Sequence, residues 1–175
     1  MSNHEKNRRK IKKIAYTGVL AALIFVGTEI HVPTLIGHIN LGDLVILITS
    51  FILGPFAAIP AAIGSAIADL ISGYAQYALP TFLIKGIMGF TAGLIMIRKG
   101  DRKITLPLKL TAAVLAEIIM IAGYFAFESL PFMYGVKAAI GSLIPNLIQA
   151  GCAIAGAIPL MYVKFLDRAG EIQRS

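Results

Sequence analysis

Five long apolar runs dominate the chain, and short segments with polar or turn-forming residues separate them. The runs lie at residues 14–30, 44–68, 81–97, 105–127 and 138–163. A helix of about 20 apolar residues spans the hydrocarbon core of a bilayer, and each run approaches or exceeds that length. The pattern therefore predicts an all-α integral membrane protein.

The run at 44–68 leaves the number of membrane crossings open. As one helix it would be about 37 Å long, since an α-helix rises about 1.5 Å per residue. Gly54 and Pro55 interrupt it, and this pair is a strong helix stop because proline lacks an amide hydrogen and clashes with the preceding turn. The chain crosses the membrane five times if the run is one helix, and six times if it is divided.

The distribution of Lys and Arg decides between these topologies, because positively charged residues collect in cytoplasmic loops. Six helices with both termini inside place nearly all of them in the cytoplasm, whereas five helices do not. We therefore predict six transmembrane helices with cytoplasmic N- and C-termini. Fourteen of the 16 Lys and Arg residues lie in three blocks, at the N-terminus, in the fourth connection and at the C-terminus: Lys6, Arg8, Arg9, Lys10, Lys12 and Lys13; Arg98, Lys99, Arg102, Lys103 and Lys109; Lys164, Arg168 and Arg174.

This topology divides the chain into a basic cytoplasmic segment at 1–13, a six-helix substrate-binding transmembrane domain at 14–163 and a cytoplasmic tail at 164–175. Composition agrees, because 57% of residues are hydrophobic and only 14% are charged, too few to cover the surface of a soluble domain. The net charge of +7 lies in blocks beside apolar runs. We expect the lipid bilayer, and no nucleic acid, as the partner of this charge.

Motifs for common enzymatic chemistry are missing from the sequence. It has no G-x-x-x-x-G-K-[ST], H-E-x-x-H or G-x-S-x-G, so we expect no enzyme activity and no cofactor. The single cysteine, Cys152, cannot form an internal disulfide or a cysteine-based zinc site. The remaining alternative is a metal site that combines imidazole and carboxylate ligands, drawn from Glu29, His31, His38 and Asp43.

Polar residues collect on the side of the membrane opposite the basic blocks. They occupy the first, third and fifth connections and the adjoining helix ends. An acidic side chain at mid-membrane costs at least about 2.5 kcal/mol on insertion scales, so it normally faces the bundle interior and has a partner or a function. The pattern predicts an outward-facing pocket whose candidate substrate-binding residues are Asn40, Asp69, Tyr74, Lys85, Glu117, Asn146 and Gln149.

Each candidate also has a purely structural explanation. Glu117 would be accounted for by an ion pair with Lys85, or by a protonated carboxyl hydrogen-bonded to Asn146. Lys85 would equally suit an interfacial anchor, and Asn146 with Gln149 would suit hydrogen bonding between helices. Asp43 and Asp69 would suit helix ends, and the tyrosines would suit an interfacial belt.

Small residues also recur four positions apart, which permits close helix contact. Gly18 and Ala22 form such a pair on the first helix, beside the basic N-terminus. We interpret them as a docking face for another membrane protein.

Several stretches resemble the S components, the substrate-binding membrane subunits of energy-coupling factor (ECF) vitamin transporters. The resemblance covers about residues 14–163 and is strongest to the riboflavin-type superfamily, especially to subunits for hydroxymethylpyrimidine or vitamin B6 compounds. The stretches that carry it are 38–43 (HINLGD), 53–55 (LGP), 64–74 (GSAIADLISGY), 82–86 (FLIKG) and 145–149 (PNLIQ).

This resemblance implies a plasma-membrane subunit that captures a vitamin from outside and docks on a transmembrane coupling subunit and two cytoplasmic ATPase subunits, which hydrolyse ATP. It places Gly18 and Ala22 at the coupling subunit. Hydroxymethylpyrimidine or a vitamin B6 compound is the favoured ligand, with riboflavin or thiamine as alternatives. The rival hypothesis is an autonomous proton-coupled secondary transporter that uses Glu117.

Overall fold

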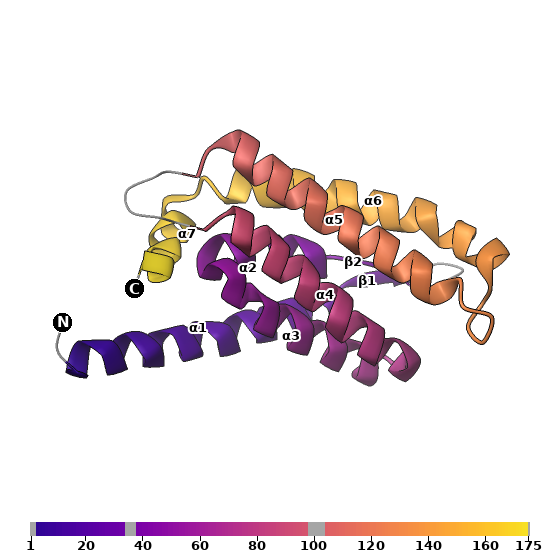
Figure 1. Ribbon diagram of the computed structural model, residues 1–175, viewed down its shortest axis with the longest axis horizontal. Helices are drawn as coiled ribbons and strands as arrows, with labels where there is room; N and C mark the ends of the chain where they lie inside the picture. Colours follow the sequence, from indigo (N-terminus) through magenta and orange to yellow (C-terminus); the bar gives the residue numbers. More distant parts are fainter. Residues whose placement is uncertain (1–2, 34–37, 98–103, 175) are drawn as a thin grey trace.

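The computed structural model describes residues 3–33, 38–97 and 104–174, which form a bundle of long helices (Figure 1). Five helical stretches are long and apolar enough to cross a membrane: Lys10–Glu29, Gly42–Ile71, Ala75–Ile95, Leu106–Glu128 and Val136–Leu160. The elements in chain order are α1 (Asn3–Glu29), β1 (His31–Pro33), β2 (His38–Asn40), α2 (Gly42–Leu53), the 3-10 helix η1 (Gly54–Ala57), α3 (Ala58–Ile71), α4 (Ala75–Ile95), α5 (Leu106–Glu128), α6 (Val136–Leu160), α7 (Lys164–Ala169) and η2 (Gly170–Arg174).

The helix break expected at Gly54 and Pro55 is present, and it reverses the chain. Asp43 contacts Lys85, and the Ser50 hydroxyl donates to the Gly89 carbonyl at 3.2 Å, so α2 runs parallel to α4. The segment formed by η1 and α3 begins at Gly54, beside Gly93 near the end of α4. It then runs along α4 in the opposite direction. The candidate span Gly42–Ile71 therefore consists of two antiparallel helices. Gly54 has φ +60°, a conformation that glycine adopts without steric cost.

The bundle has two different ends. The described N- and C-terminal residues lie together at one end, which we call the termini end, at the left of Figure 1. The β1–β2 pair and the α3–α4 and α5–α6 connections lie toward the other end, which we call the hairpin end. Four members of the predicted basic block in the fourth connection fall outside the described residues: Arg98, Lys99, Arg102 and Lys103.

Small buried residues bring the helices close together. A Cβ atom on Gly93 would lie 2.0 Å from the carbonyl oxygen of Gly54, and one on Gly89 would lie 2.9 Å from that of Ala57. Many of the large apolar side chains on α1, α4, α5 and α6 point outward. This inside-out pattern suits a bilayer, where helices associate through close packing because lipid tails are as apolar as leucine.

The C-terminal segment folds back on the end of α2. In an uninterrupted helix the Phe51 carbonyl would accept a hydrogen bond from the amide of residue 55, but Pro55 has no amide hydrogen. The Gln173 side chain supplies that bond, with its Nε2 2.7 Å from the Phe51 oxygen. The segment at 164–174 thus repairs a defect created by the helix break.

Candidate functional site

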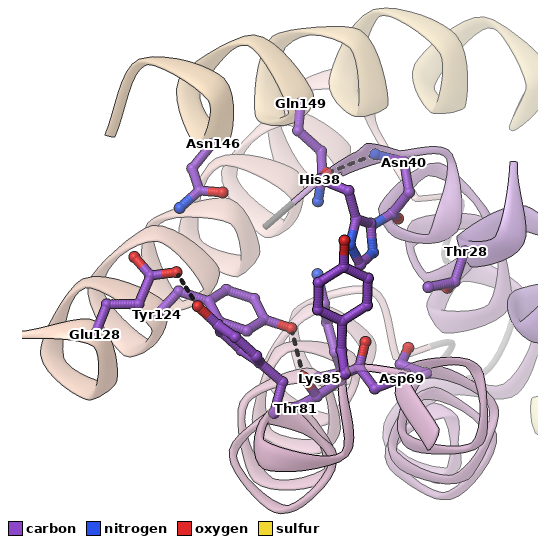
Figure 2. A pocket seen from close by; sticks show the side chains of 13 residues that line it. Thr28, His38, Asn40, Asp69, Thr81, Lys85, Tyr124, Glu128, Asn146 and Gln149 are labelled. Carbon is purple, nitrogen blue, oxygen red and sulfur yellow. Dashed lines mark hydrogen bonds between the residues drawn. The ribbon is translucent and has the colours of Figure 1, made fainter. Parts of the chain in front are cut away.

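A cavity of about 500 Å³, including the part open to solvent, lies at the hairpin end (Figure 2). Its wall comes from α1, β2, α3, the α3–α4 turn, α4, α5 and α6, so elements far apart in sequence build it together. Thirteen residues line it: Thr28, His38, Asn40, Ser65, Asp69, Tyr74, Tyr77, Thr81, Lys85, Tyr124, Glu128, Asn146 and Gln149. Six of the seven candidates from the sequence are among them, and the exception is Glu117.

A buried ion pair joins α2 to α4 beside this cavity. Lys85 Nζ contacts Asp43 Oδ1, and both side chains are almost fully shielded from solvent. The second oxygen, Asp43 Oδ2, accepts a hydrogen bond from Gln149 Nε2 at 2.5 Å. Gln149 Oε1 in turn accepts the backbone amide of Asn40 at 2.7 Å. This network satisfies the buried charges and ties α2, α4, α6 and β2 together.

These contacts settle two of the structural alternatives. Lys85 pairs with Asp43, rather than with Glu117 as one alternative had it. Asp43 lies in the first turn of α2 but does not cap this helix, whose first amide, that of Gly42, donates instead to Asn40 Oδ1 at 2.8 Å. Its carboxylate serves the interior of the bundle instead of the helix terminus.

Glu128 is a second buried carboxyl, and it lies in the cavity wall at the end of α5. Tyr77 OH donates to Glu128 Oε1 at 3.1 Å, and the Ser142 hydroxyl donates to Glu128 Oε2. Both carboxylate oxygens therefore have partners from neighbouring helices. Our sequence interpretation did not include Glu128 among the binding residues.

A series of aromatic rings borders the same cavity. The His38 ring centroid is 5.1 Å from that of Tyr74, which is 6.4 Å from that of Tyr77, and Tyr77 is 6.3 Å from Tyr124. The Tyr124 and Thr81 hydroxyls are hydrogen-bonded at 2.9 Å (Figure 2). Such a wall offers both flat apolar faces and hydroxyl groups to a ring-shaped ligand.

His38, which lies outside the membrane-spanning helices, is neutral in this setting. Partial burial, together with the nearby His31 and Lys85, lowers its pKa from 6.5 to about 4, against the opposing effects of Glu29 and Asp43. The neutral imidazole can donate one hydrogen bond and accept another.

Glu117 and Asp69 differ from the other buried acids. Neither oxygen of Glu117 has a hydrogen-bond partner among the described residues, although its side chain is buried and close enough to Asp43 and Lys85 for electrostatic interaction. Asp69 Oδ2 also lacks a partner there, and Asp69 lines the cavity whereas Glu117 does not.

The spacing of polar residues along the sequence indicates the lining residues on α4 and α5 that our sequence interpretation did not include. Tyr77, Thr81 and Lys85 are each four residues apart on α4, so they share one helix face. Tyr124 and Glu128 are four apart on α5 in the same way. A search for polar stripes with helical spacing, extended from Lys85, identifies this wall.

Two further predictions concern other places. Gly18 and Ala22 are exposed on α1, and a Cβ atom on Gly18 would have nothing within 4 Å.

Of the proposed metal ligands, Glu29 accepts a hydrogen bond from Ser72 at 2.7 Å and Asp43 is bound to Lys85. Within the described parts of the chain, no group of three or more His, Cys, Asp or Glu residues is placed to hold a metal ion.

Comparison with known proteins identifies the family. A family model described as "ECF-type riboflavin transporter, S component" matches residues 8–166, which include every residue of the cavity wall. An uncharacterized protein from the gap 3′ region of Pyrococcus woesei is 33% identical over 133 residues, covering 74% of this chain and 85% of that protein. The thiamine precursor transporter HmpT of Lactococcus lactis subsp. cremoris is 29% identical over 148 residues, covering 82% of this chain and 81% of HmpT.

These matches agree with the resemblance seen in the motifs, and the apolar helices fit a multi-pass membrane protein. S components are vitamin-uptake subunits of transporters and not enzymes. The chain therefore belongs to the ECF-type riboflavin transporter S-component family.

Proposed function

We propose that this chain is the substrate-capture subunit of an ATP-driven ECF importer in the plasma membrane, and that it binds a small water-soluble vitamin or vitamin precursor. The observation that carries the proposal is the cavity at the hairpin end, where polar and aromatic side chains from several helices converge.

The proposed topology has six membrane crossings, with both termini in the cytoplasm and the hairpin end outside. The chain reversal at Gly54 supports this topology because α2 and α3 run in opposite directions. Basic residues at the termini end, such as Lys12 and Lys164, support the orientation through their preference for the cytoplasmic side.

The chemistry of the wall favours a neutral or cationic ring that carries hydrogen-bond donors. Carboxyl groups outnumber free cations in the wall, since Lys85 is paired with Asp43. A phosphate ester would meet repulsion there. Hydroxymethylpyrimidine or a vitamin B6 compound is the favoured ligand, and the relative HmpT is itself named a thiamine precursor transporter. Glu117 lies outside the cavity wall and is proposed to act on the ligand only through its electrostatic interaction with Asp43 and Lys85. The proposed contacts of the ligand come from the other six candidate residues: Asn40, Asp69, Tyr74, Lys85, Asn146 and Gln149.

The test is native mass spectrometry of the detergent-purified protein, followed by titration with hydroxymethylpyrimidine, pyridoxine, pyridoxamine, thiamine and riboflavin. We expect one of these compounds to bind tightly with one molecule per chain. Absence of binding by the whole panel would contradict the capture function.

A second candidate function is proton-coupled transport by this chain alone. It is favoured by the buried Glu117, which has no hydrogen-bond partner in the part of the chain that the structure describes. Liposomes that contain only this protein distinguish the two functions. Uptake driven by a pH gradient, and lost in Glu117→Gln, would support the autonomous transporter. Binding without uptake is the result expected of a capture subunit.

We further propose that Gly18 and Ala22 dock on a transmembrane coupling subunit, which in turn binds two cytoplasmic ATPase subunits. Both residues are small and exposed on α1, so a partner helix can approach closely. Gly18→Leu should abolish assembly with the coupling subunit and uptake, while the ligand Kd stays unchanged.

The matched control is Gly151→Leu, because a Cβ atom on Gly151 also has nothing within 4 Å. This variant should assemble normally. Equal loss of assembly in both variants, or loss of ligand binding in Gly18→Leu, would contradict a docking role for the α1 face.

A further inference from the structure

The buried carboxyl groups at the hairpin end differ in how many of their oxygens are already bonded. Asp43 uses both oxygens, one with Lys85 and one with Gln149. Glu128 also uses both, one with Tyr77 and one with Ser142. These two side chains are structurally satisfied before any ligand arrives.

Asp69 differs from both because one of its oxygens is unused. Its side chain lies near the end of α3 and is only 4% exposed. Among the described residues, the buried oxygen Oδ2 of Asp69 has no hydrogen-bond partner. An unsatisfied buried acceptor of this kind destabilises the empty site. A ligand that offers a hydrogen atom to Oδ2 would remove that destabilisation.

Asp69 lies where α3 leads into the α3–α4 turn. The backbone amide of Tyr74 donates to the Asp69 carbonyl at 2.8 Å, which holds the start of the α3–α4 turn in place. Figure 2 shows Asp69 beside Thr81 and Lys85, on the opposite side of the cavity from Asn146. The Lys85 ammonium group is already bound to Asp43. No cation among the described residues forms an ion pair with Asp69.

We propose that Asp69 determines ligand specificity by accepting a hydrogen bond from an amino group or a protonated ring nitrogen of a heteroaromatic ligand. This inference rests on the proposed capture function and adds the chemical group that the site selects. A ligand with only hydroxyl or carbonyl groups at that position loses the charge-assisted bond, and a carbonyl oxygen there faces the lone pairs of Oδ2. Tyr74 borders the same cavity, where it can lie against the ligand ring.

The test uses two pairs of compounds that differ at the nitrogen group: hydroxymethylpyrimidine with its desamino analogue, and pyridoxamine with pyridoxine. Calorimetry on the full-length protein gives the Kd of each. We expect the wild type to prefer the amine of the pair it binds by about tenfold or more, which corresponds to about 1.4 kcal/mol. Asp69→Asn should reduce the preference below about threefold, and Asp69→Glu should retain part of it.

The control is Glu29→Gln. Glu29 lies at the same end and its charge acts on Asp69, but it does not line the cavity. This variant should keep the amine preference. Thermal unfolding without ligand provides a folding check, since loss of an unsatisfied carboxyl should leave the midpoint of Asp69→Asn unchanged or higher.

Three results would overturn the inference. They are equal affinity for both members of the preferred pair in the wild type, an unchanged preference in Asp69→Asn, and no binding of either pair. If neither pair binds but riboflavin does, the capture function stands and only the role of Asp69 fails. If no vitamin binds, both fail.

Discussion

The two ends of the bundle are held together by different forces. At the hairpin end, buried polar side chains connect the helices through an ion pair and directional hydrogen bonds, as between Asp43, Lys85 and Gln149. At the termini end, η1 and α4 meet through backbone and small side chains, as at Gly54 and Gly93. The hairpin end depends on buried charges and hydrogen bonds, and the termini end depends on close steric fit. A substitution that removes a charge should therefore destabilise the hairpin end, and one that adds volume should destabilise the termini end.

The largest effect should come from removing one partner of the ion pair. Lys85→Met leaves Asp43 charged and buried, with Gln149 as its remaining partner, and this should lower the free energy of unfolding by about 3–5 kcal/mol. Thermal or denaturant unfolding in detergent measures the change.

Two variants sharpen this prediction. Lys137→Met, at an exposed position, should change stability by less than about 0.5 kcal/mol. The double variant Lys85→Met/Asp43→Leu should recover part of the loss, because it leaves no unpaired charge. A single variant as stable as the wild type would mean that the pair contributes nothing to this end.

A smaller loss should follow from adding one methyl group at the other end. Gly93→Ala places a Cβ atom 2.0 Å from a backbone oxygen, and the backbone cannot move aside as a flexible side chain would. We expect a loss of about 1–3 kcal/mol, the usual range for overpacking. Gly151→Ala, with open space at its Cβ, should be neutral or stabilising by up to about 1 kcal/mol. Equal stability of both variants would contradict the tight η1–α4 contact.

The smallest effect should be a pH dependence at the hairpin end. The pKa of His38 is about 4 in the folded state and returns to about 6.5 in the unfolded state, where the side chain is exposed to water. The unfolded state therefore takes up more protons between these values, and stability should fall as the pH falls from 6.5 toward 4. In His38→Gln, unfolding midpoints measured across this range should fall less steeply. An identical slope in both proteins would assign the pH dependence to other groups.

Local chemistry made part of this structure predictable. The break at Gly54 and Pro55 follows from two residues that disfavour a helix whatever surrounds them. The position of Lys85 in the cavity wall was also expected from its place near one end of a long apolar helix. Its partner was not, because the pairing with Asp43 depends on how the short helix α2 lies against α4.

The depth to which the cavity extends between the helices was the property that the sequence left undetermined. Glu117 is buried as expected for an acid in the middle of an apolar run, but it does not reach the cavity wall. Tyr124 and Glu128 on the same helix do. The three residues are spaced by seven and four positions, so they share one face of α5, and Glu117 lies about 10 Å from Tyr124 along the helix axis, beyond the inner limit of the cavity.

The series of aromatic rings gives the molecule an optical property. The sequence has no tryptophan and six tyrosines, so tyrosine dominates its near-ultraviolet spectrum. Three of those phenol rings, Tyr74, Tyr77 and Tyr124, line the cavity. A ring-shaped compound that enters the cavity should change near-ultraviolet circular dichroism and tyrosine emission directly. The protein thus carries its own reporter of occupancy, without any attached dye.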